Sequence, residues 1–446
     1  MANSPKTVLA GSLSVKESMK GIFIIGFLFF MFGFVSWINS ILIPYFRIGF
    51  ELSHAASYLV AFSFYISYLI FSIPSSYLLK KIGFKKGMMY GFWAMALGAL
   101  IFIPSAAAMV YPLFLLGLFS IGAGLAMLQT AANPYVTILG PKERAAQRMS
   151  IMGIFNKGAG ILAPLIFAAV IFRASDSQLF DQLSSMGAVE KAEALKELIG
   201  RVIVPYSFVG LALIIFGLLI RFSPLPEIDT EHETEEVAMA NTSKTSIIQF
   251  PHLILGAIAW FLHVGTQVVS IDTIISYAET MGINLLQAKA FPSYVLSATI
   301  VGYIVGIICI PRFISQRKAL IVCAILGTIF TTMILYAHGS VTLLGHTADW
   351  SIWFVVMLGL ANSLIGPAIW PLAIDGLGRF TKIGSSVIVM GISGNAILPM
   401  LYGLLADKFD ERIGYWVLVP CYLYILFYGI WGYKIKNWNK NRIAVN

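Results

Sequence analysis

Amide side chains repeat along one apolar stretch of the chain, "LQTAANPYV" at 128–136. Gln129, Asn133 and Thr137 fall at positions i, i+4 and i+8, so a helix would place them on one face. An amide can donate and accept hydrogen bonds at the same time, which suits it to binding the hydroxyl groups of a neutral solute. A row of amides in an apolar stretch is therefore expected to face a cavity or a neighbouring helix.

Other apolar stretches carry polar side chains of the same kinds. "FVSWINSILIP" holds Asn39 and Ser40, and "WFLHVGTQVVSIDT" holds a histidine and an amide four residues apart. Together with the amide stripe they give a set of candidate substrate-binding residues: Asn39, Gln129, Asn133, Asn156, His263, Gln267, Asn362, Trp370 and Asn395. The alternative for each is that it bonds helix to helix, and for His263 that it is a satisfied core histidine.

The composition of this set favours a neutral, hydroxyl-rich solute such as a sugar. Trp370, which lies between two prolines, would offer a flat apolar wall to the C–H face of a sugar ring, whereas Trp37 is expected to pack against other helices. A phosphorylated substrate would need arginine clusters, and no apolar stretch has an arginine at its centre.

Two charged residues of the apolar stretches are candidates for coupling to an ion, Asp272 and Lys157. A buried carboxylate can take up and release a proton when its surroundings change. Asp272 could instead lie at the outer end of its span, and Lys157 could hold a substrate oxygen, pair with a carboxylate or reach towards the membrane surface. On an unbroken helix Asp272 lies well round from Gln267, so a shared site requires a distorted helix.

The composition identifies a membrane protein. The 446 residues are 58% hydrophobic and only 11% charged, with a mean hydropathy of +0.84. A soluble domain would be closer to a quarter charged. The apolar blocks are continuous rather than alternating, and lipid cannot satisfy free backbone groups, so the blocks are predicted to be helices. The three cysteines show no metal-binding spacing, and no cofactor is expected beyond a co-transported proton or sodium ion.

Twelve spans are predicted, including one near 251–277 and one near 351–374. "GLA" at 124–126 recurs at 359–361, "MGI" at 152–154 recurs at 390–392, and both offsets lie near 235–238 residues. Repeats in the same order indicate two parallel six-helix halves that can rock around a mid-membrane site. The predicted organisation is a cytoplasmic tail (1–20), an N-terminal six-helix bundle (21–221), a cytoplasmic linker (222–250), a C-terminal six-helix bundle (251–433) and a second cytoplasmic tail (434–446).

The positions of the lysines and arginines predict the orientation. With the N-terminus inside, 21 of the 30 Lys and Arg lie on the cytoplasmic side and 8 on the other. Both termini are therefore placed in the cytoplasm, and the net charge of +9 needs no nucleic acid as a partner. The expected partners are a small sugar and the lipid bilayer, with the chain acting as a monomer.

Several of these motifs resemble one transporter family. "NSILIP" at 39–44, "LQTAANPYVTILGP" at 128–141, "MGIFNKGAGILAP" at 152–164 and "MLGLANSLIGPAIWPLAIDGLG" at 357–378 are similar to the fucose–galactose–glucose:proton symporter branch of the major facilitator superfamily. Within that branch the chain looks most like bacterial glucose/galactose and N-acetylglucosamine permeases. The resemblance implies an all-α membrane protein with twelve transmembrane helices in two pseudo-symmetric six-helix bundles, and a sugar-cavity role for Asn39, Asn133 and Asn156.

The chain departs from the fucose-permease pattern at two carboxylates. That pattern has Asp where this chain has Ser40 and Glu where it has Gln129, so coupling must use another group, with Asp272 as the first candidate. The expected function is cation-coupled import of a neutral monosaccharide (glucose, galactose or a related hexose), with a proton placed ahead of sodium. The alternatives left open are an N-acetylglucosamine or other sugar permease, a sugar uniporter, an exporter of amphipathic solutes and a sugar sensor. No enzyme motif is present, so no catalytic activity is expected.

Overall fold

The structure, a computed structural model, describes residues 7–9, 15–52, 56, 59–173, 176, 179, 182–183, 185–229, 239, 241–283 and 285–438. Its N-terminal half is almost entirely helical. The elements of this half are β1 (Thr7–Leu9), α1 (Val15–Gly49), α3 (Leu59–Ala108), α4 (Tyr111–Ile138), η1 (Lys142–Arg144), α5 (Ala145–Ile171), α7 (Ala188–Gly200), α8 (Ile203–Phe222) and β2 (Glu227–Asp229).

The C-terminal half contains more helix breaks than the N-terminal half. Its elements are η2 (Ile247–Gln249), α10 (Pro251–Asp272), α11 (Ile274–Thr280), α12 (Leu285–Ala288), α13 (Phe291–Cys309), α14 (Gln316–Tyr336), β3 (Ser340–Leu343), β4 (His346–Asp349), α15 (Trp350–Ser363), α16 (Ile365–Ala373), η3 (Gly378–Phe380), α17 (Thr381–Met390), η4 (Gly391–Ser393), α18 (Gly394–Lys408), α19 (Glu411–Gly414), η5 (Tyr415–Val417), α20 (Leu418–Ile430) and η6 (Gly432–Lys434).

The predicted twelve-span, all-α membrane fold is confirmed. In the described part of the chain, 11 helical segments are long and apolar enough to cross a bilayer. One of them, α3, is 50 residues long and contains Gly83 in a non-helical conformation (φ 80°, ψ 174°), so it is two spans joined by a tight turn. A residue with a side chain is strained at this positive φ, which explains why glycine occupies the turn.

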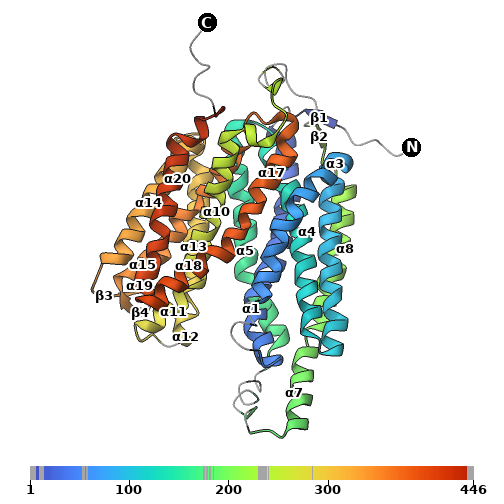
Figure 1. Ribbon diagram of the computed structural model, residues 1–446, viewed down its shortest axis with the longest axis vertical. Helices are drawn as coiled ribbons and strands as arrows, with labels where there is room; N and C mark the ends of the chain where they lie inside the picture. Colours follow the sequence, from blue (N-terminus) through green and yellow to red (C-terminus); the bar gives the residue numbers. More distant parts are fainter. Residues whose placement is uncertain are drawn as a thin grey trace.

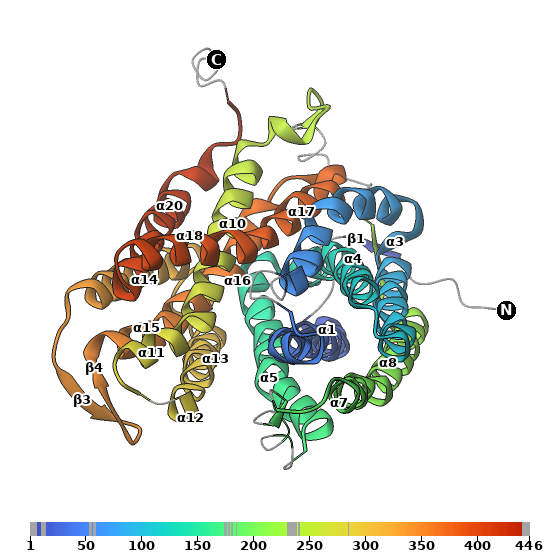
Figure 2. The same cartoon turned by 60° about the horizontal axis from the view of Figure 1, so that its bottom comes forward.

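The helices form two bundles that stand side by side (Figure 1). The elements α1 to α8 make one bundle and α10 to α20 the other. Figure 2 shows the seam between them, where α5 packs against α13 and α16, and α17 packs against α3 and α4. Within the first bundle α3 packs closely on α4, because Gly98 and Gly117 face each other and a Cβ at Gly98 would lie 2.5 Å from the Gly117 carbonyl oxygen.

The surface and the interior have the polarity expected of a membrane protein. Large apolar side chains such as Phe208 (69% exposed) and Leu219 (57% exposed) cover the outside of α8. Buried polar side chains such as Asn133 and Ser67 lie inside the bundles. This arrangement matches a chain whose outer solvent is hydrocarbon rather than water.

The two short sheets mark the opposite ends of the molecule (Figure 1). At one end, here called the β1/β2 end, strand β1 pairs in parallel with β2. At the other, the β3/β4 end, β3 and β4 form an antiparallel hairpin. Arg148 fixes the start of α5 at the β1/β2 end, because its guanidinium donates to the carbonyl oxygens of Val136 (2.8 Å) and Thr137 (2.6 Å) in the last turn of α4 and of Pro141 (2.8 Å) in the connection that follows.

Candidate functional site

A cavity of about 250 Å³ lies between the two bundles. Residues from α1, α3, α4 and α5 line it on one side, and residues from α10, α13, α16, η4 and α18 line it on the other. Along α10 the lining runs from Trp260 to Asp272, which begins about 14 Å from the start of the helix at Pro251 and ends about 32 Å from it, at 1.5 Å per residue. For a hydrocarbon core about 30 Å thick, the cavity therefore begins near mid-membrane and extends towards the β3/β4 end.

The amides of α4 face this cavity. Gln129 and Asn133 both line it, one helical turn apart, and the Gln129 Nε2 donates a hydrogen bond to the Tyr68 hydroxyl at 3.1 Å. Asn133 is only 3% exposed. Thr137, the third residue of the stripe, lies nearer the helix end and donates its hydroxyl proton to the Asn133 carbonyl at 2.9 Å. The stripe thus contributes two amides to the cavity and one hydroxyl to its own helix.

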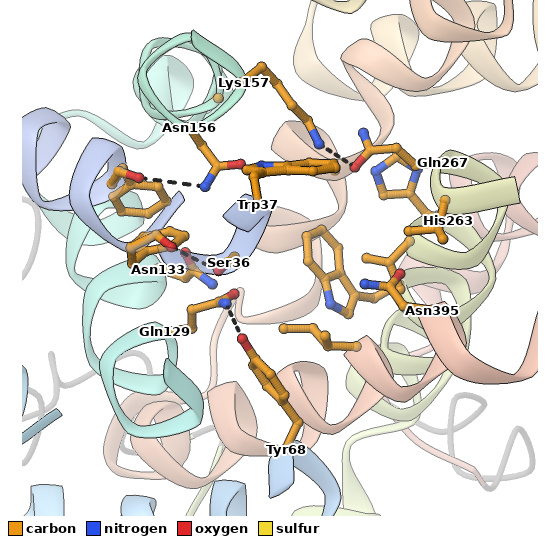
Figure 3. Close-up of a pocket in the computed structure, with 18 of the residues that line it drawn as sticks. Ser36, Trp37, Tyr68, Gln129, Asn133, Asn156, Lys157, His263, Gln267 and Asn395 are labelled. Atoms are coloured by element: carbon orange, nitrogen blue, oxygen red, sulfur yellow. Dashed lines mark hydrogen bonds between the residues drawn. The ribbon is translucent and has the colours of Figure 1, made fainter. Parts of the chain in front are cut away.

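The side chains of α5 cross the cavity from the same bundle. Asn156 lines it and makes a long contact of 3.5 Å from Nδ2 to the Phe29 carbonyl. Lys157 extends across to the other bundle, where its Nζ donates to Gln267 Oε1 at 2.8 Å. The same Nζ lies 4.7 Å from the centre of the Trp37 ring, within range of a cation–π interaction (Figure 3).

Three candidates on α10 line the cavity from the second bundle: His263, Gln267 and Asp272. The expectation that a shared site requires a distorted helix is wrong, since Gln267 and Asp272 both line the cavity although α10 is continuous from Pro251 to Asp272; the helix breaks only beyond Asp272, before α11 begins at Ile274. Because Asp272 is the last residue of its helix, no further turn of α10 covers its side chain. Asn395, near the start of α18, completes the amides of this side, and its Oδ1 is buried without a hydrogen-bond partner in the described part.

The structure does not bring two of the candidates to the cavity, Asn362 and Trp370. Asn362 is fully buried inside the second bundle, where its Oδ1 accepts hydrogen bonds from the hydroxyls of Thr266 (3.1 Å) and Tyr422 (3.1 Å). Trp370 is also fully buried, with its ring centre 5.6 Å from that of Trp260. The expectation that they line the cavity is therefore corrected, and both are placed in helix packing.

The positions of Trp37 and Trp370 are the reverse of those expected. Trp37, which was expected to pack, lines the cavity, and Trp260 forms the wall that was assigned to Trp370. Tyr65, Tyr68 and Tyr303 also line the cavity and were not among the candidates. Asn39 belongs to α1, but the placement of its side chain lies outside the described part of the structure, and its assigned role stays a prediction.

The two bundles touch at the β1/β2 end, beyond the floor of the cavity. Gln147 Nε2 donates to the Ile307 carbonyl at 2.7 Å, and the Ala146 N–H donates to Gln316 Oε1 at 3.3 Å. Lys142 forms an ion pair with Asp375. Burial alone would raise the pKa of the Asp375 carboxyl, but Lys142 and Lys436 together hold it below its ordinary value. These contacts close the β1/β2 end in this state.

The arrangement is suited to binding and transport rather than to a chemical reaction. Amides and tyrosine hydroxyls can donate to and accept from the hydroxyls of a solute, and the two tryptophans offer apolar faces. Within the described residues, no group of three or more His, Cys, Asp or Glu is arranged to hold a metal ion. A cavity of about 250 Å³ is slightly smaller than the roughly 300 Å³ lower bound of drug-sized pockets, a size appropriate to one small ring.

Comparisons with known proteins agree with this geometry. A family model described as the Major Facilitator Superfamily matches residues 25–393. A glucose/galactose transporter of Brucella abortus biovar 1 (strain 9-941) is 34% identical over 410 residues, 91% of this chain and 92% of that protein. An L-fucose-proton symporter of Escherichia coli (strain K12) is 31% identical over 383 residues, 85% of each chain.

Solved structures show the same fold. The transporter FucP, crystallised in the outward conformation, is similar with a TM-score of 0.79 at 27% identity, covering 93% of this chain and 98% of that one. The proton:xylose symporter XylE, bound to 6-bromo-6-deoxy-D-glucose, has a TM-score of 0.62 at 14% identity, with 93% and 96% covered. At that identity the second likeness concerns the fold alone.

Proposed function

The chain belongs to the Major Facilitator Superfamily, and on this premise we propose that it imports a neutral hexose across a membrane by cation-coupled alternating access. Glucose and galactose are the first candidates, because a relative 34% identical over 91% of this chain is a glucose/galactose transporter. The observation that carries the proposal is the inter-bundle cavity lined by Gln129, Asn133, Asn156, Gln267 and Asn395.

The chemistry of the cavity supports a sugar over a charged or greasy solute. A hexose hydroxyl needs a donor and an acceptor at once, and each of these amides supplies both. Trp37 and Trp260 would stack on the C–H faces of the ring. No arginine lines the cavity among the described residues, which disfavours a phosphorylated sugar. An exporter of amphipathic solutes would require a larger and more apolar chamber.

Asp272 is the proposed site of cation coupling. It is the one carboxylate of the described cavity lining, and it lies at the end of α10, where the helix breaks. A carboxylate in this position can bind a proton or a sodium ion from the side to which the cavity opens. The E. coli relative, which is a proton symporter, makes the proton the first candidate.

The orientation and cellular location are further parts of the proposal. The β1/β2 end carries the lysines and arginines of the turn at Gly83, of η1 and of the 312–318 connection, so we place it in the cytoplasm. The relatives are bacterial, which favours the inner membrane, with both termini inside. In this orientation the structure represents an outward-facing state, closed at the cytoplasmic end, and the transporter acts as a monomer.

Sugar uptake by purified protein in liposomes tests the function directly. The panel is D-glucose, D-galactose, L-fucose, N-acetylglucosamine and xylitol, each offered with an inward proton gradient, an inward sodium gradient or neither. We expect uphill uptake of glucose or galactose with one of the two gradients. Equal uptake with and without gradients would make the protein a uniporter, and failure to move any sugar would refute the proposal.

Substitutions test the assignment of the site. Gln129→Ala, Asn133→Ala and Asn156→Ala should each reduce sugar uptake at unchanged protein level, whereas Asp272→Asn should abolish uphill accumulation and leave sugar exchange intact. Normal uptake in all three alanine variants would move the sugar site elsewhere. Accumulation by Asp272→Asn would show that another group couples the cation.

A further inference from the structure

The cavity holds one ammonium and one carboxylate among its described lining residues, and they belong to opposite bundles. Lys157 comes from α5 in the first bundle, and Asp272 comes from the end of α10 in the second. Lys157 is buried, whereas the Asp272 side chain is exposed where the cavity opens, and the two interact electrostatically. A buried charge is costly unless it is paired, so the partner that each charge takes must matter to the transport cycle.

In this state Lys157 is held by a neutral partner. Its Nζ donates to Gln267 Oε1 at 2.8 Å and lies 4.7 Å from the centre of the Trp37 ring, while the residue is only 5% exposed. Gln267 precedes Asp272 by five residues on α10, a rise of about 7.5 Å along the helix axis. The ammonium is thus bound at the level of the amide, one and a half turns short of the carboxylate.

Closure of the β3/β4 end would change the separation between the Lys157 ammonium and the Asp272 carboxylate. The bundles now touch at the β1/β2 end, through Gln147 and Ile307 among other contacts. Rocking one bundle against the other must separate that end and bring the β3/β4 ends together. Asp272 lies nearer the β3/β4 end than Gln267 does, so the motion carries the carboxylate towards α5 and the Lys157 side chain.

We propose that Lys157 is a tethered cation that takes the place of the transported cation at Asp272 when the β3/β4 end closes, and so expels it on the opposite side. The inference rests on the proposed function, because it requires that Asp272 binds the coupled ion. In the open state Gln267 retains the ammonium, and the carboxylate is free to bind a proton or sodium ion. After closure the ammonium pairs with the carboxylate, and the bound ion leaves towards the β1/β2 end.

The charges balance in each step. If the ion is a proton, the carboxyl O–H bond breaks, the proton passes to water, and the carboxylate remains paired with the Lys157 ammonium. If the ion is sodium, it exchanges one for one with the ammonium. In a medium of low dielectric one carboxylate favours one adjacent cation over two, so the two cations exclude each other. The other titratable groups of the cavity are His263 on α10, Tyr65 and Tyr68 on α3, and Tyr303 on α13.

The experiment measures how cation on the inside of proteoliposomes inhibits sugar uptake. Removing the competing ammonium in Lys157→Met should let the internal cation hold Asp272 more tightly, so half-inhibition should occur at about a tenfold lower internal concentration. Lys157→Arg, which keeps the charge, should remain near the wild type. Lys85→Met serves as a matched control, because Lys85 is also buried (6% exposed) but donates to the Ser223 carbonyl within the first bundle, at the β1/β2 end. Parallel arms use internal protons and internal sodium.

Sugar counterflow, measured at equal cation concentrations inside and outside the proteoliposomes, separates this inference from the proposed function. Lys157→Met should retain counterflow, because loaded carriers exchange without releasing the ion. In an Asp272→Asn background, adding Lys157→Met should change neither counterflow nor cation inhibition. Failure of the wild type to exchange any sugar refutes the proposed function itself.

Two results would overturn the inference alone. One is that the wild type shows counterflow but Lys157→Met is inhibited at the same internal cation concentration as the wild type. The other is an equal loss of counterflow from Lys157→Met in the wild-type and Asp272→Asn backgrounds, because the lysine would then act on the sugar or on the fold. Should Lys157→Met prove unstable in a thermal unfolding assay, Lys157→Gln is measured in the same way and decides by the same criteria.

Discussion

The hydrogen bond between Gln129 and Tyr68 allows a sharp test of the sugar site. The Gln129 Nε2 donates to the Tyr68 hydroxyl at 3.1 Å, and both side chains line the cavity. This bond uses one donor of the amide and leaves its carbonyl oxygen for the substrate. The perturbation consists of three variants, namely Tyr68→Phe, Gln129→Ala and the double substitution.

The expected magnitudes follow from the contacts that each variant loses. Tyr68→Phe removes one neutral buried hydrogen bond, worth about 0.5–1.5 kcal/mol net, so the KM for sugar should rise roughly 2- to 12-fold. Gln129→Ala also leaves a substrate hydroxyl without a partner, and the total loss of about 2–3 kcal/mol corresponds to a rise of roughly 30- to 150-fold. The double variant should fall short of additivity by about the value of the lost pair.

The assay is sugar counterflow in proteoliposomes at equal cation concentration inside and outside, so that the KM reports on sugar binding and not on coupling. Tyr206→Phe is the matched control for the tyrosine, because Tyr206 is equally buried but lies on α8, away from the cavity. Its KM should equal that of the wild type. A wild-type KM for both Tyr68→Phe and Gln129→Ala, or strictly additive effects in the double variant, would refute the role of this pair.

Three further predictions concern other parts of the molecule. Asn362→Ala should lower the thermal stability of the protein by about 1–3 kcal/mol, since the buried Tyr422 hydroxyl loses its acceptor and the Thr266 hydroxyl keeps only the His263 carbonyl, and should leave the sugar KM within about twofold of the wild type. Gly98→Val should destabilise the first bundle by about 1–3 kcal/mol, measured by chemical denaturation in detergent, because its Cβ would meet the Gly117 carbonyl oxygen at 2.5 Å. Burial would raise the pKa of Asp375, but Lys142 and a second lysine lower it, so the ion pair at the β1/β2 end is complete above the pKa of an unpaired aspartate and is lost as pH falls through the depressed value. Spin-label distances across that end should therefore lengthen on acidification, and Asp375→Asn should lengthen them at every pH.

Membrane spans could be predicted from the sequence because hydrocarbon selects for apolar residues along the whole length of each helix. The cavity position of Gln129 and Asn133 was also predictable, since residues four apart share a helix face regardless of how that helix packs. The function assigned to the individual side chains stays a prediction, because their position in a cavity does not measure binding.

The incorrect site predictions concern residues whose surroundings depend on helix–helix packing. Asn362 and Trp370 have the same chemistry as the cavity residues, yet α15 and α16 turn them towards α10 and α20 rather than towards the other bundle. Spacing along one helix does not reveal which neighbour a face meets. Tyr65 and Tyr68 were missed for a different reason, because tyrosine is common in apolar helices and carries no spacing signal of its own. Gln267 and Asp272 share the cavity without a break between them, because the lining extends along α10 from Trp260 to Asp272 and so reaches more than one face of that helix.

The contacts between the bundles explain how the closed end can open during each cycle. Two cross-bundle hydrogen bonds, from Gln147 and from the Ala146 N–H, are worth about 0.5–1.5 kcal/mol each, and the partly exposed Lys142–Asp375 pair adds about 1 kcal/mol or less. These polar contacts, beside the packing of α17 on α3 and α4, sum to roughly 1–4 kcal/mol, which is comparable to the gap between two conformations that a ligand can interconvert. A sugar that gains two or three hydrogen bonds from amides of both bundles only when they close around it supplies a difference of that size. Strong ion pairs at this end would lock one state, so weak contacts at the end and specific contacts in the cavity are the combination that alternating access requires.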